Sequence, residues 1–298
     1  MMPSTRLTGC ITALVTPFSR DLAVDHPAFA KLVAWQISEG IHGLVPVGST
    51  GEAATLTLPE RVAVVRATVE CAAGRLPVIA GAGGNDTLVA IETSRAMAAA
   101  GATHLMHVSP MYSKPPQRGI LAHFRAIADA STIPIVVYNV PGRTASNITA
   151  ETTLALAEHP NIVAVKEASG SIDQIREILR HRPPTLSVLS GDDNLTVDVI
   201  AAGGDGIISV VSNAAPRAMA EMTAAALRGD MAMASAANER LHALMEAAFV
   251  ESNPIPIKAA LAMMGRIANH LRLPLVPMDE THSARLRTSL VAAGALAS

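Results

Sequence analysis

Eight short apolar runs recur along the chain, each bounded by glycine, proline or polar residues. They cover residues 10–15, 43–48, 77–81, 104–108, 133–139, 162–166, 186–190 and 206–211. Their short length and β-branched content are typical of buried strands. Most of the segments between them are about 20 to 30 residues long and contain an amphipathic stretch, as at 27–40 and 86–101. The sequence therefore predicts strands that alternate with helices.

This alternation implies a parallel sheet, because each return crossover is a helix that covers the sheet. Eight such units in about 220 residues have the number and length of the α/β fold called the (β/α)8 or TIM barrel. A doubly wound open sheet is the structural alternative, but no glycine-rich dinucleotide-binding motif opens the first unit. We therefore predict a TIM barrel.

The strand pattern stops after residue 229. The rest of the chain has helical pattern alone, at residues 231–250, 254–265 and 279–296. We predict a catalytic barrel over residues 1–229 and a C-terminal helical region over residues 230–298 that packs on it.

Composition and charge exclude several classes of function. Of the 298 residues, 50% are hydrophobic and 16% are charged, which supports a large core. A formal net charge of −2 gives no basic surface for nucleic acid or for an anionic membrane. No apolar run approaches the roughly 18 residues of a membrane helix, and Pro17 stops the first run without a cleavage-site pattern. We expect a globular, cytoplasmic protein that acts on small molecules.

The sequence predicts no metal site. Cys10 and Cys71 have no metal-binding spacing, and we interpret both as reduced thiols. His104 and His107 lie three apart on one predicted strand, so their side chains should point to opposite faces.

Reactive side chains gather at the ends of the predicted strands. In a TIM barrel the active site lies at the C-terminal ends of the strands, which makes these positions candidates. They are Ser49 and Thr50 after the second run, Tyr112 after the fourth, Tyr138 and Arg143 after the fifth, and Lys166 at the end of the sixth. We expect them to converge on one mouth of the barrel.

Lys166 ends the apolar run "IVAVK" in a chain that has four lysines. Alternation along a strand places Ile162, Ala164 and Lys166 on one face, with Val163 on the other, and we expect the lysine face to be the barrel interior. Burial would lower the pKa of the Lys166 amine, and a neutral amine attacks a carbonyl carbon to form a Schiff base. A structural role, with Lys166 paired to Glu167 or extended to solvent, stays open at this point.

Three further groups each have a functional and a purely structural interpretation. Tyr138 could carry the protons that imine formation moves, or be a core tyrosine. Arg143 could bind a carboxylate through two parallel hydrogen bonds, or be a solvated loop residue. Asp192 and Asp193 could bind a cation, but we favour a helix N-cap.

Five motifs occur in a familiar order. "GSTGE", "YNVPGRT", "VAVKEASG", "SGDD" and "NPIPIK" resemble those of the dihydrodipicolinate synthase and N-acetylneuraminate lyase family of pyruvate-dependent class I aldolases. The resemblance extends from "GCITALVTPF" to "LRLPLVPM". It implies that Lys166 forms the Schiff base with pyruvate, so that no separate cofactor is needed.

Within the family the chain is most similar to the synthase branch, which condenses pyruvate with L-aspartate semialdehyde on the route to diaminopimelate and lysine. The resemblance implies that Tyr138 passes protons through Ser49 to Tyr112, and that Tyr112 comes from a neighbouring subunit. The implied assembly is a homotetramer built from two tight dimers.

The resemblance also implies the substrate-binding residues. Thr50 would bind the pyruvate carboxylate, with Gly48 and Ile208 also in contact with substrate. Arg143 would bind the carboxylate of the semialdehyde, and its presence favours the synthase branch over the sialic acid lyases.

One position departs from the synthase pattern. Ser49 stands where synthases usually have threonine, and serine there is familiar in the lyase branch and in sugar-acid relatives. Another pyruvate-dependent aldolase or dehydratase, such as a 4-hydroxy-2-oxoglutarate aldolase, therefore remains an alternative. A more distant alternative is a non-catalytic barrel that senses a keto acid.

Many members of the family are inhibited by lysine at the tight-dimer interface, through a glutamate, two histidines, an asparagine and a tyrosine. At the corresponding places this chain has Val89 for the glutamate, Leu58 and Arg61 for the histidines, Asn85, and Met111 for the tyrosine. We therefore predict weak or absent inhibition by L-lysine.

Overall fold

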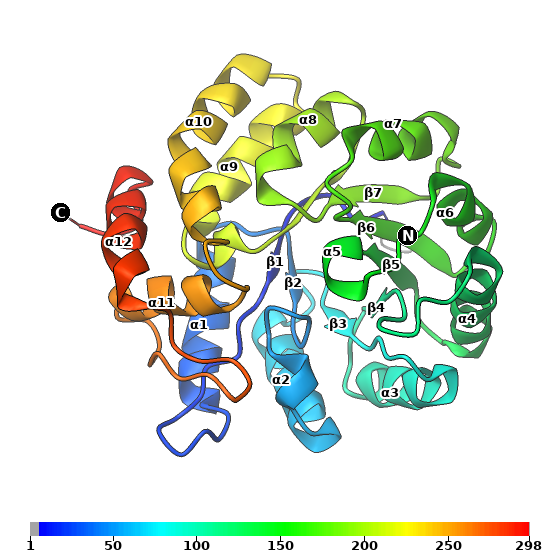
Figure 1. The fold of residues 1–298 in the computed structure, drawn as a ribbon, viewed down its shortest axis with the longest axis horizontal. Helices are drawn as coiled ribbons and strands as arrows, with labels where there is room; N and C mark the ends of the chain where they lie inside the picture. The colour runs from blue at the N-terminus through cyan, green and yellow to red at the C-terminus, as the bar shows by residue number, and fades with distance from the viewer. Residues whose placement is uncertain (1–5, 298) are drawn as a thin grey trace.

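The computed structural model describes residues 6–297, in which eight parallel strands alternate with helices (Figure 1). The predicted TIM barrel is confirmed, and each predicted strand is present with its bounds shifted by at most a few residues. The strands are β1 Gly9–Ala13, β2 Gly43–Val45, β3 Ile79–Gly81, β4 His104–Val108, β5 Ile135–Asn139, β6 Ile162–Glu167, β7 Ser187–Ser190 and β8 Gly206–Ser209.

The sheet closes on itself. Its strands pair in the order β2-β1-β8-β7-β6-β5-β4-β3, so that β1 lies beside β8, with Ile11 opposite Ile208. A parallel bridge between Leu44 and Val78 joins the two ends, and the Leu44 N–H donates to the Pro77 carbonyl at 3.0 Å. The C-terminal ends of all eight strands therefore meet around one mouth.

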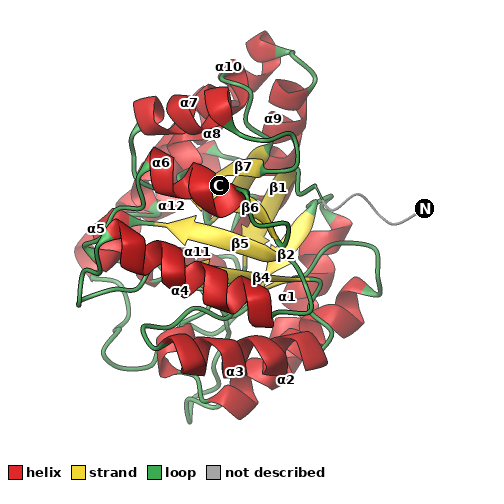
Figure 2. Ribbon diagram, turned by 90° about the vertical axis from the view of Figure 1, so that its right-hand side faces the viewer, coloured by secondary structure: helices red, strands yellow, loops and turns green. Residues whose placement is uncertain are grey.

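Helices surround the strands, as Figure 2 shows in red around yellow. Those of the barrel are α1 His26–Ser38, α2 Leu58–Ala72, α3 Thr87–Ala99, α4 Gln117–Ala130, α5 Pro141–Thr144, α6 Ala150–Ala157, α7 Ile172–His181, α8 Thr196–Ala201 and α9 Pro216–Leu227. Single-turn helices η1 Ala53–Thr55, η2 Asp193–Leu195 and η3 Val211–Asn213 lie in the loops after β2, β7 and β8. Many helices begin at a residue whose side chain caps them; for example, Thr57 and Glu60 form a capping box on α2.

Three helices come after the barrel, as the pattern predicted: α10 Met231–Ala247, α11 Ile255–Met263 and α12 Ser283–Ala292, with η4 Glu280–His282 before the last. Helix α10 packs on α9, and α12 packs on α10 and α11. Figure 1 shows the three helices together on one side of the barrel. Residues 1–5 and 298, which belong to the two predicted parts of the chain, lie outside the described residues. No helix in the described part of the chain is long and apolar enough to cross a membrane.

Two apolar clusters form the core. One fills the barrel and includes Ile11, Ile79, Val136, Leu189 and Ile208. The other, larger cluster lies between the strands and the surrounding helices. Alternating side chains of each strand supply the two clusters, which is why the strands are buried on both faces.

Strand β6 breaks this alternation, and the predicted position of Ile162 on the Lys166 face is wrong. Ile135 of β5 pairs with Ile162, but the next residue of β5 pairs with Ala164, so Val163 is an extra residue in the ladder. Such a bulge puts Val163 in the inner cluster beside Ala164 and turns Ile162 to the outer one. Beyond the bulge the alternation resumes, and Lys166 lies on the inner face with Ala164.

A buried ion pair ties the C-terminal region to the mouth of the barrel. Lys258 of α11 donates to Glu52 Oε1 at 2.6 Å and to the Thr16 carbonyl at 3.0 Å, and both charged side chains have no exposed area. The Lys258 amine also lies 4.3 Å from the centre of the Phe18 ring. Because Glu52 belongs to the "GSTGE" loop after β2, this pair fixes that loop against α11.

Candidate active site

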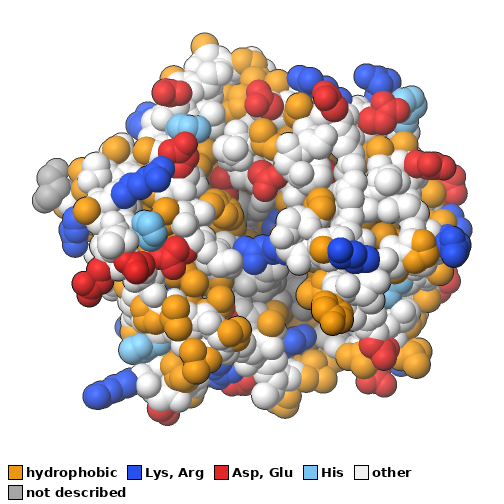
Figure 3. All heavy atoms as spheres, in the orientation of Figure 1, with side chains coloured by type: hydrophobic (Ala, Val, Ile, Leu, Met, Phe, Trp, Pro, Cys, Tyr) orange, Lys and Arg blue, Asp and Glu red, His pale blue; other side chains and the backbone are white. Residues whose placement is uncertain are grey.

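A cavity of about 60 Å³ lies at the C-terminal ends of the strands. The polar side chains that line it are Ser49, Thr50, Tyr138, Arg143, Lys166, Asp192 and Asn253. An adjoining cavity of about 420 Å³ shares Ser49, Tyr138, Arg143 and Asn253 with it. Figure 3 shows the face of the molecule seen in Figure 1 hollowed near its centre. The two cavities therefore form one continuous hollow at the mouth of the barrel.

Lys166 lines the smaller cavity. It is 4% exposed and pairs in register with Tyr138 of β5. Burial lowers the pKa of the Lys166 amine to about 8, a shift that Arg143 favours and that Asp192 and Asp193 oppose. An amine with this pKa is substantially neutral just above neutral pH and can act as a nucleophile.

Tyr138 lies beside that amine. The Lys166 Nζ lies 4.4 Å from the centre of the Tyr138 ring. Burial raises the pKa of the Tyr138 phenol to about 12, while Arg143 acts in the opposite direction. The phenol is therefore protonated at neutral pH and can donate its proton to a reacting oxygen.

The structural alternative for Lys166, a pair with Glu167, is wrong. The carboxylate of Glu167 accepts hydrogen bonds from Asn139 Nδ2 at 3.0 Å, from the Ser169 N–H at 2.8 Å and from Gln174 Nε2 at 3.2 Å. Successive residues of a strand point to opposite faces, so Glu167 points away from the cavity that Lys166 lines. Burial raises the pKa of Glu167, and these hydrogen bonds oppose the shift.

The predicted N-cap role of the two aspartates is also wrong, since neither side chain caps η2. Asp193 instead accepts hydrogen bonds from Ser209 Oγ at 2.5 Å and from the Val210 and Val211 N–H groups at 3.1 and 3.3 Å. It thereby braces the end of β8, and burial raises its pKa to about 6. Asp192 lines the smaller cavity.

Among the described residues, no group of three or more His, Cys, Asp and Glu side chains is arranged so that it could hold a metal ion. His107 points outward to Ser94 of α3, with 3.2 Å between His107 Nε2 and Ser94 Oγ. Burial lowers the pKa of His107 to about 3, so the imidazole is neutral at ordinary pH.

Thr50 and Arg143 are both joined to Asn253, in the loop between α10 and α11. The Asn253 Nδ2 donates to Thr50 Oγ1 at 3.0 Å, and an Arg143 Nη2 donates to the Asn253 carbonyl at 3.1 Å. Asn253 was not predicted as a site residue from the sequence. It opens the motif "NPIPIK", but it lies on no strand end, and only that motif could have drawn attention to it.

Of the other predicted residues, two line the cavities and two do not. Gly48 lines both cavities, as does Ser49, whose side chain is exposed. Ile208 is fully buried on the inner face of β8 and is not among the residues that line either cavity. Tyr112 lies in the loop after β4, is 92% exposed and does not line either cavity.

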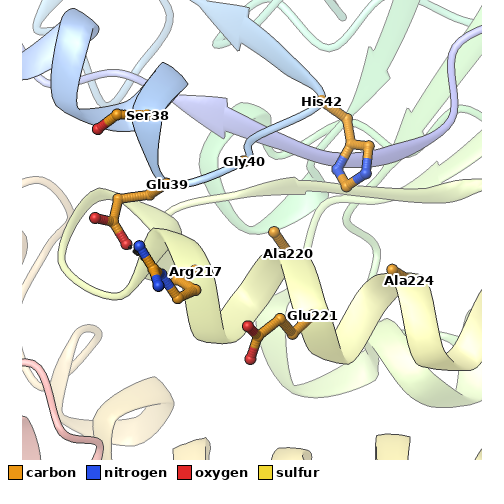
Figure 4. A pocket seen from close by; sticks show the side chains of 8 residues that line it. All are labelled: Ser38, Glu39, Gly40, His42, Arg217, Ala220, Glu221 and Ala224. Atoms are coloured by element: carbon orange, nitrogen blue, oxygen red, sulfur yellow. Dashed lines mark hydrogen bonds and ion pairs between the residues drawn. The ribbon is translucent and has the colours of Figure 1, made fainter.

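A separate pocket of about 370 Å³ lies outside the barrel, between the C-terminal end of α1 and helix α9 (Figure 4). Two of its charged groups pair with each other, as Arg217 donates to Glu39 at 2.8 Å. It shares no residue with the two cavities at the barrel mouth.

Comparisons with known proteins agree with this geometry. The sequence model of the Dihydrodipicolinate synthetase family matches residues 6–293. A 4-hydroxy-tetrahydrodipicolinate synthase from Koribacter versatilis is 50% identical, over 98% of this chain and 97% of its own length. A solved monomeric dihydrodipicolinate synthase variant is 41% identical, with a TM-score of 0.97 and 99% of each chain covered. The dihydrodipicolinate synthase of Acinetobacter baumannii, solved with pyruvate, is 41% identical, with a TM-score of 0.95 and coverage of 97% of this chain and 99% of that one. The chain therefore belongs to the dihydrodipicolinate synthetase family.

Proposed function

We propose that the chain is a 4-hydroxy-tetrahydrodipicolinate synthase, a lyase that condenses pyruvate with L-aspartate 4-semialdehyde. The observation that carries the proposal is the buried Lys166 amine of lowered pKa, which lies against the Tyr138 ring at the strand ends. The activity in the name of the Koribacter versatilis relative, which is 50% identical, supports the same reaction.

The neutral Lys166 amine attacks the keto carbon of pyruvate. The resulting carbinolamine loses water as its hydroxyl takes a proton from the Tyr138 phenol, which leaves an imine between the Lys166 nitrogen and the former keto carbon. The Tyr138 phenolate left by this step then takes a proton from the methyl group, which converts the protonated imine into an enamine and restores the phenol. The imine itself serves as the electron sink, so the proposal includes no other cofactor.

The enamine carbon then attacks the aldehyde of the second substrate, and the new alkoxide takes the proton of the Tyr138 phenol. A carbon–carbon bond forms and the imine is restored on Lys166. The amino group of the semialdehyde then adds to the imine carbon and expels the lysine amine, which closes the ring and frees the enzyme. No oxidation or reduction takes place in this sequence.

Two subsites follow from the polar side chains. Thr50, with Gly48, holds the pyruvate carboxylate next to Lys166. Ile208, which belongs to the same inner cluster as Tyr138, is the further proposed contact to substrate. Arg143 faces both cavities and binds the carboxylate of the semialdehyde.

The proton relay requires an oligomer. Ser49 lines the cavity beside Tyr138, and we propose that it passes protons to Tyr112 of a neighbouring subunit. The 92% exposure of Tyr112 and the exposure of Leu88 and Val89 support a partner on this surface. The proposed assembly is a homotetramer of two tight dimers, although one structural relative is a monomeric variant.

We also propose a cytoplasmic location. Cys10 and Cys71 are both free, as is usual for proteins of a reducing compartment.

One residue, Ser49, supports an alternative pyruvate-dependent activity. Ser49 lines both cavities at the place where synthases usually have threonine, so an aldolase or dehydratase for another acceptor is the alternative function. The two functions share the imine and differ in the second substrate.

Two measurements test the proposal in sequence. Borohydride reduction with pyruvate should add one pyruvate-derived group to Lys166, found by mass spectrometry and peptide mapping. Lys166→Ala should abolish the adduct, and Lys31→Ala, a change at an exposed position of α1, should not. A coupled assay with aspartate semialdehyde should then show turnover. An adduct on another lysine contradicts the mechanism, while an adduct without turnover of the semialdehyde favours the alternative.

A further inference from the structure

Asn253 is the one described residue that contacts both proposed subsites by hydrogen bonds. Its amide nitrogen donates to Thr50 Oγ1 at 3.0 Å, and its carbonyl accepts from Arg143 at 3.1 Å. It is 5% exposed and lines both cavities. The residue comes from the loop between α10 and α11, outside the barrel.

The direction of the Thr50 contact constrains the Thr50 hydroxyl. The Asn253 amide is oriented with its Nδ2 toward Thr50, while its Oδ1 is buried and has no hydrogen-bond partner among the described residues. In this orientation Thr50 Oγ1 is the acceptor, and its own proton is free to point elsewhere. Among residues 6–297 this is the only hydrogen bond of the Thr50 side chain, which is 3% exposed and lines the smaller cavity. The Thr50 proton can therefore point into the smaller cavity, which Lys166 also lines, and donate to a ligand there.

A carboxylate is the ligand group that fits such a donor. It offers acceptors only, and a hydrogen bond between a hydroxyl and a charged oxygen is stronger than one between neutral groups. A Thr50 hydroxyl free to rotate could instead turn its oxygen toward the carboxylate, which would repel it. The Asn253 amide removes that orientation.

We infer that Asn253 is a positioning residue of the active site, whose amide holds the Thr50 hydroxyl as a donor to the pyruvate carboxylate. This inference rests on the proposed function. The backbone carbonyl of Asn253 holds Arg143 in the same way, and this contact does not depend on the side chain. A substitution of the side chain therefore isolates the Thr50 contact.

The test compares Asn253→Leu, which removes the amide at similar size, with wild type in the coupled assay. We expect the KM for pyruvate to rise about 10- to 100-fold, which is the effect of a weakened hydrogen bond to a charged group, while kcat changes by less than about threefold. Asn253→Asp keeps the shape but turns the donor into an acceptor, and should raise the KM at least as much. Asn253→Asp also provides a folded variant if Asn253→Leu does not fold.

A double-mutant cycle separates positioning from a merely structural role. In the Thr50→Val background the Asn253→Leu change should add less than about twofold to the KM, because the hydroxyl that it orients is absent. The matched control is Asn161→Leu, where the amide donates to the carbonyls of Ala128, Ser131 and Ile133 before β6. This control should lower the melting temperature and leave the KM unchanged.

The outcomes are distinct. An unchanged KM in both Asn253 variants, or fully additive effects with Thr50→Val, overturns the inference and leaves the proposed function in place if wild type still forms the imine. Failure of wild type to form an imine with pyruvate overturns the proposed function, and the inference with it.

Discussion

Tyr138 and Lys166 are partners across the paired strands β5 and β6, with the Lys166 Nζ 4.4 Å from the centre of the Tyr138 ring. Both side chains are buried, and burial shifts their pKa values in opposite directions. It lowers the pKa of the amine to about 8 and raises the pKa of the phenol to about 12. The pair therefore offers a neutral nucleophile and a protonated acid over the same range of pH.

The rate of imine formation should depend on pH through Lys166. The pKa of the Lys166 amine is about 8, so at lower pH the amine is mostly protonated and cannot attack. The kcat/KM for pyruvate should therefore rise by up to about tenfold per pH unit toward pH 8 and then level off. Asp192 opposes the lowering of this pKa, so Asp192→Asn should move the midpoint to lower pH. A pH profile of wild type and variant measures both, and a midpoint that stays in place or moves upward contradicts the assignment.

Tyr138→Phe should lower turnover by roughly two to four orders of magnitude, the usual contribution of a positioned acid–base group. Pyruvate should still bind, because the phenol is not its proposed anchor. Tyr112→Phe, on the exposed loop after β4, should cause a smaller loss. Steady-state kinetics with saturating pyruvate decides between them, and wild-type activity in the Tyr138 variant removes the proton-transfer role.

Arg143→Ala should impair the use of aspartate semialdehyde more than the binding of pyruvate. Loss of a charge-assisted contact to a carboxylate should lower kcat/KM for aspartate semialdehyde by about 30- to 1000-fold. The pyruvate adduct trapped with borohydride should remain. An unchanged kcat/KM for the semialdehyde would favour the alternative aldolase.

L-Lysine should inhibit weakly or not at all. Glu60 and Asp86 could substitute for the missing glutamate, but both carboxylates are engaged. Glu60 binds Arg272 at 2.5 Å, which lowers its pKa to about 2, and Asp86 caps α3 by accepting from the Val89 N–H at 3.2 Å. An ammonium group would have to compete with Arg272 for Glu60 and with the Leu88 and Val89 N–H groups for Asp86, so its lost hydration would be only partly replaced. Initial rates over a titration to millimolar lysine test this, and strong submillimolar inhibition contradicts it.

Glu52→Gln should destabilise the fold by about 3 to 5 kcal/mol, because it leaves the buried Lys258 charge without its counterion. Urea unfolding measures the change. The matched control is Glu39→Gln, whose partner Arg217 is exposed, so that solvent screens the ion pair and the loss of stability should be much smaller. Adding Lys258→Met to Glu52→Gln should restore part of the stability, and no recovery would show that the effect is not due to the unpaired charge.

Much of the fold could be predicted because it depends on local pattern. The period of apolar residues specified eight strands and the helices between them, and the number of units specified the barrel. The same pattern marked Lys166 and Tyr138, because a TIM barrel gathers the residues after its strands at one mouth. Residues at the end of a strand could therefore be identified from the sequence without knowledge of their tertiary contacts.

The tertiary structure decided the features that depend on contacts between distant segments. The bulge at Val163 arises from the pairing of β6 with β5, and one extra residue there changes which side chains of β6 enter the barrel. Asn253 reaches Thr50 across 203 positions of sequence, because α10 returns the chain to the mouth of the barrel. Asp193 likewise finds its partners at the end of β8 and directly after it, rather than on its own helix. Local periodicity carries the identity of each strand and helix, but the geometry of the site depends on which distant backbones come to lie side by side.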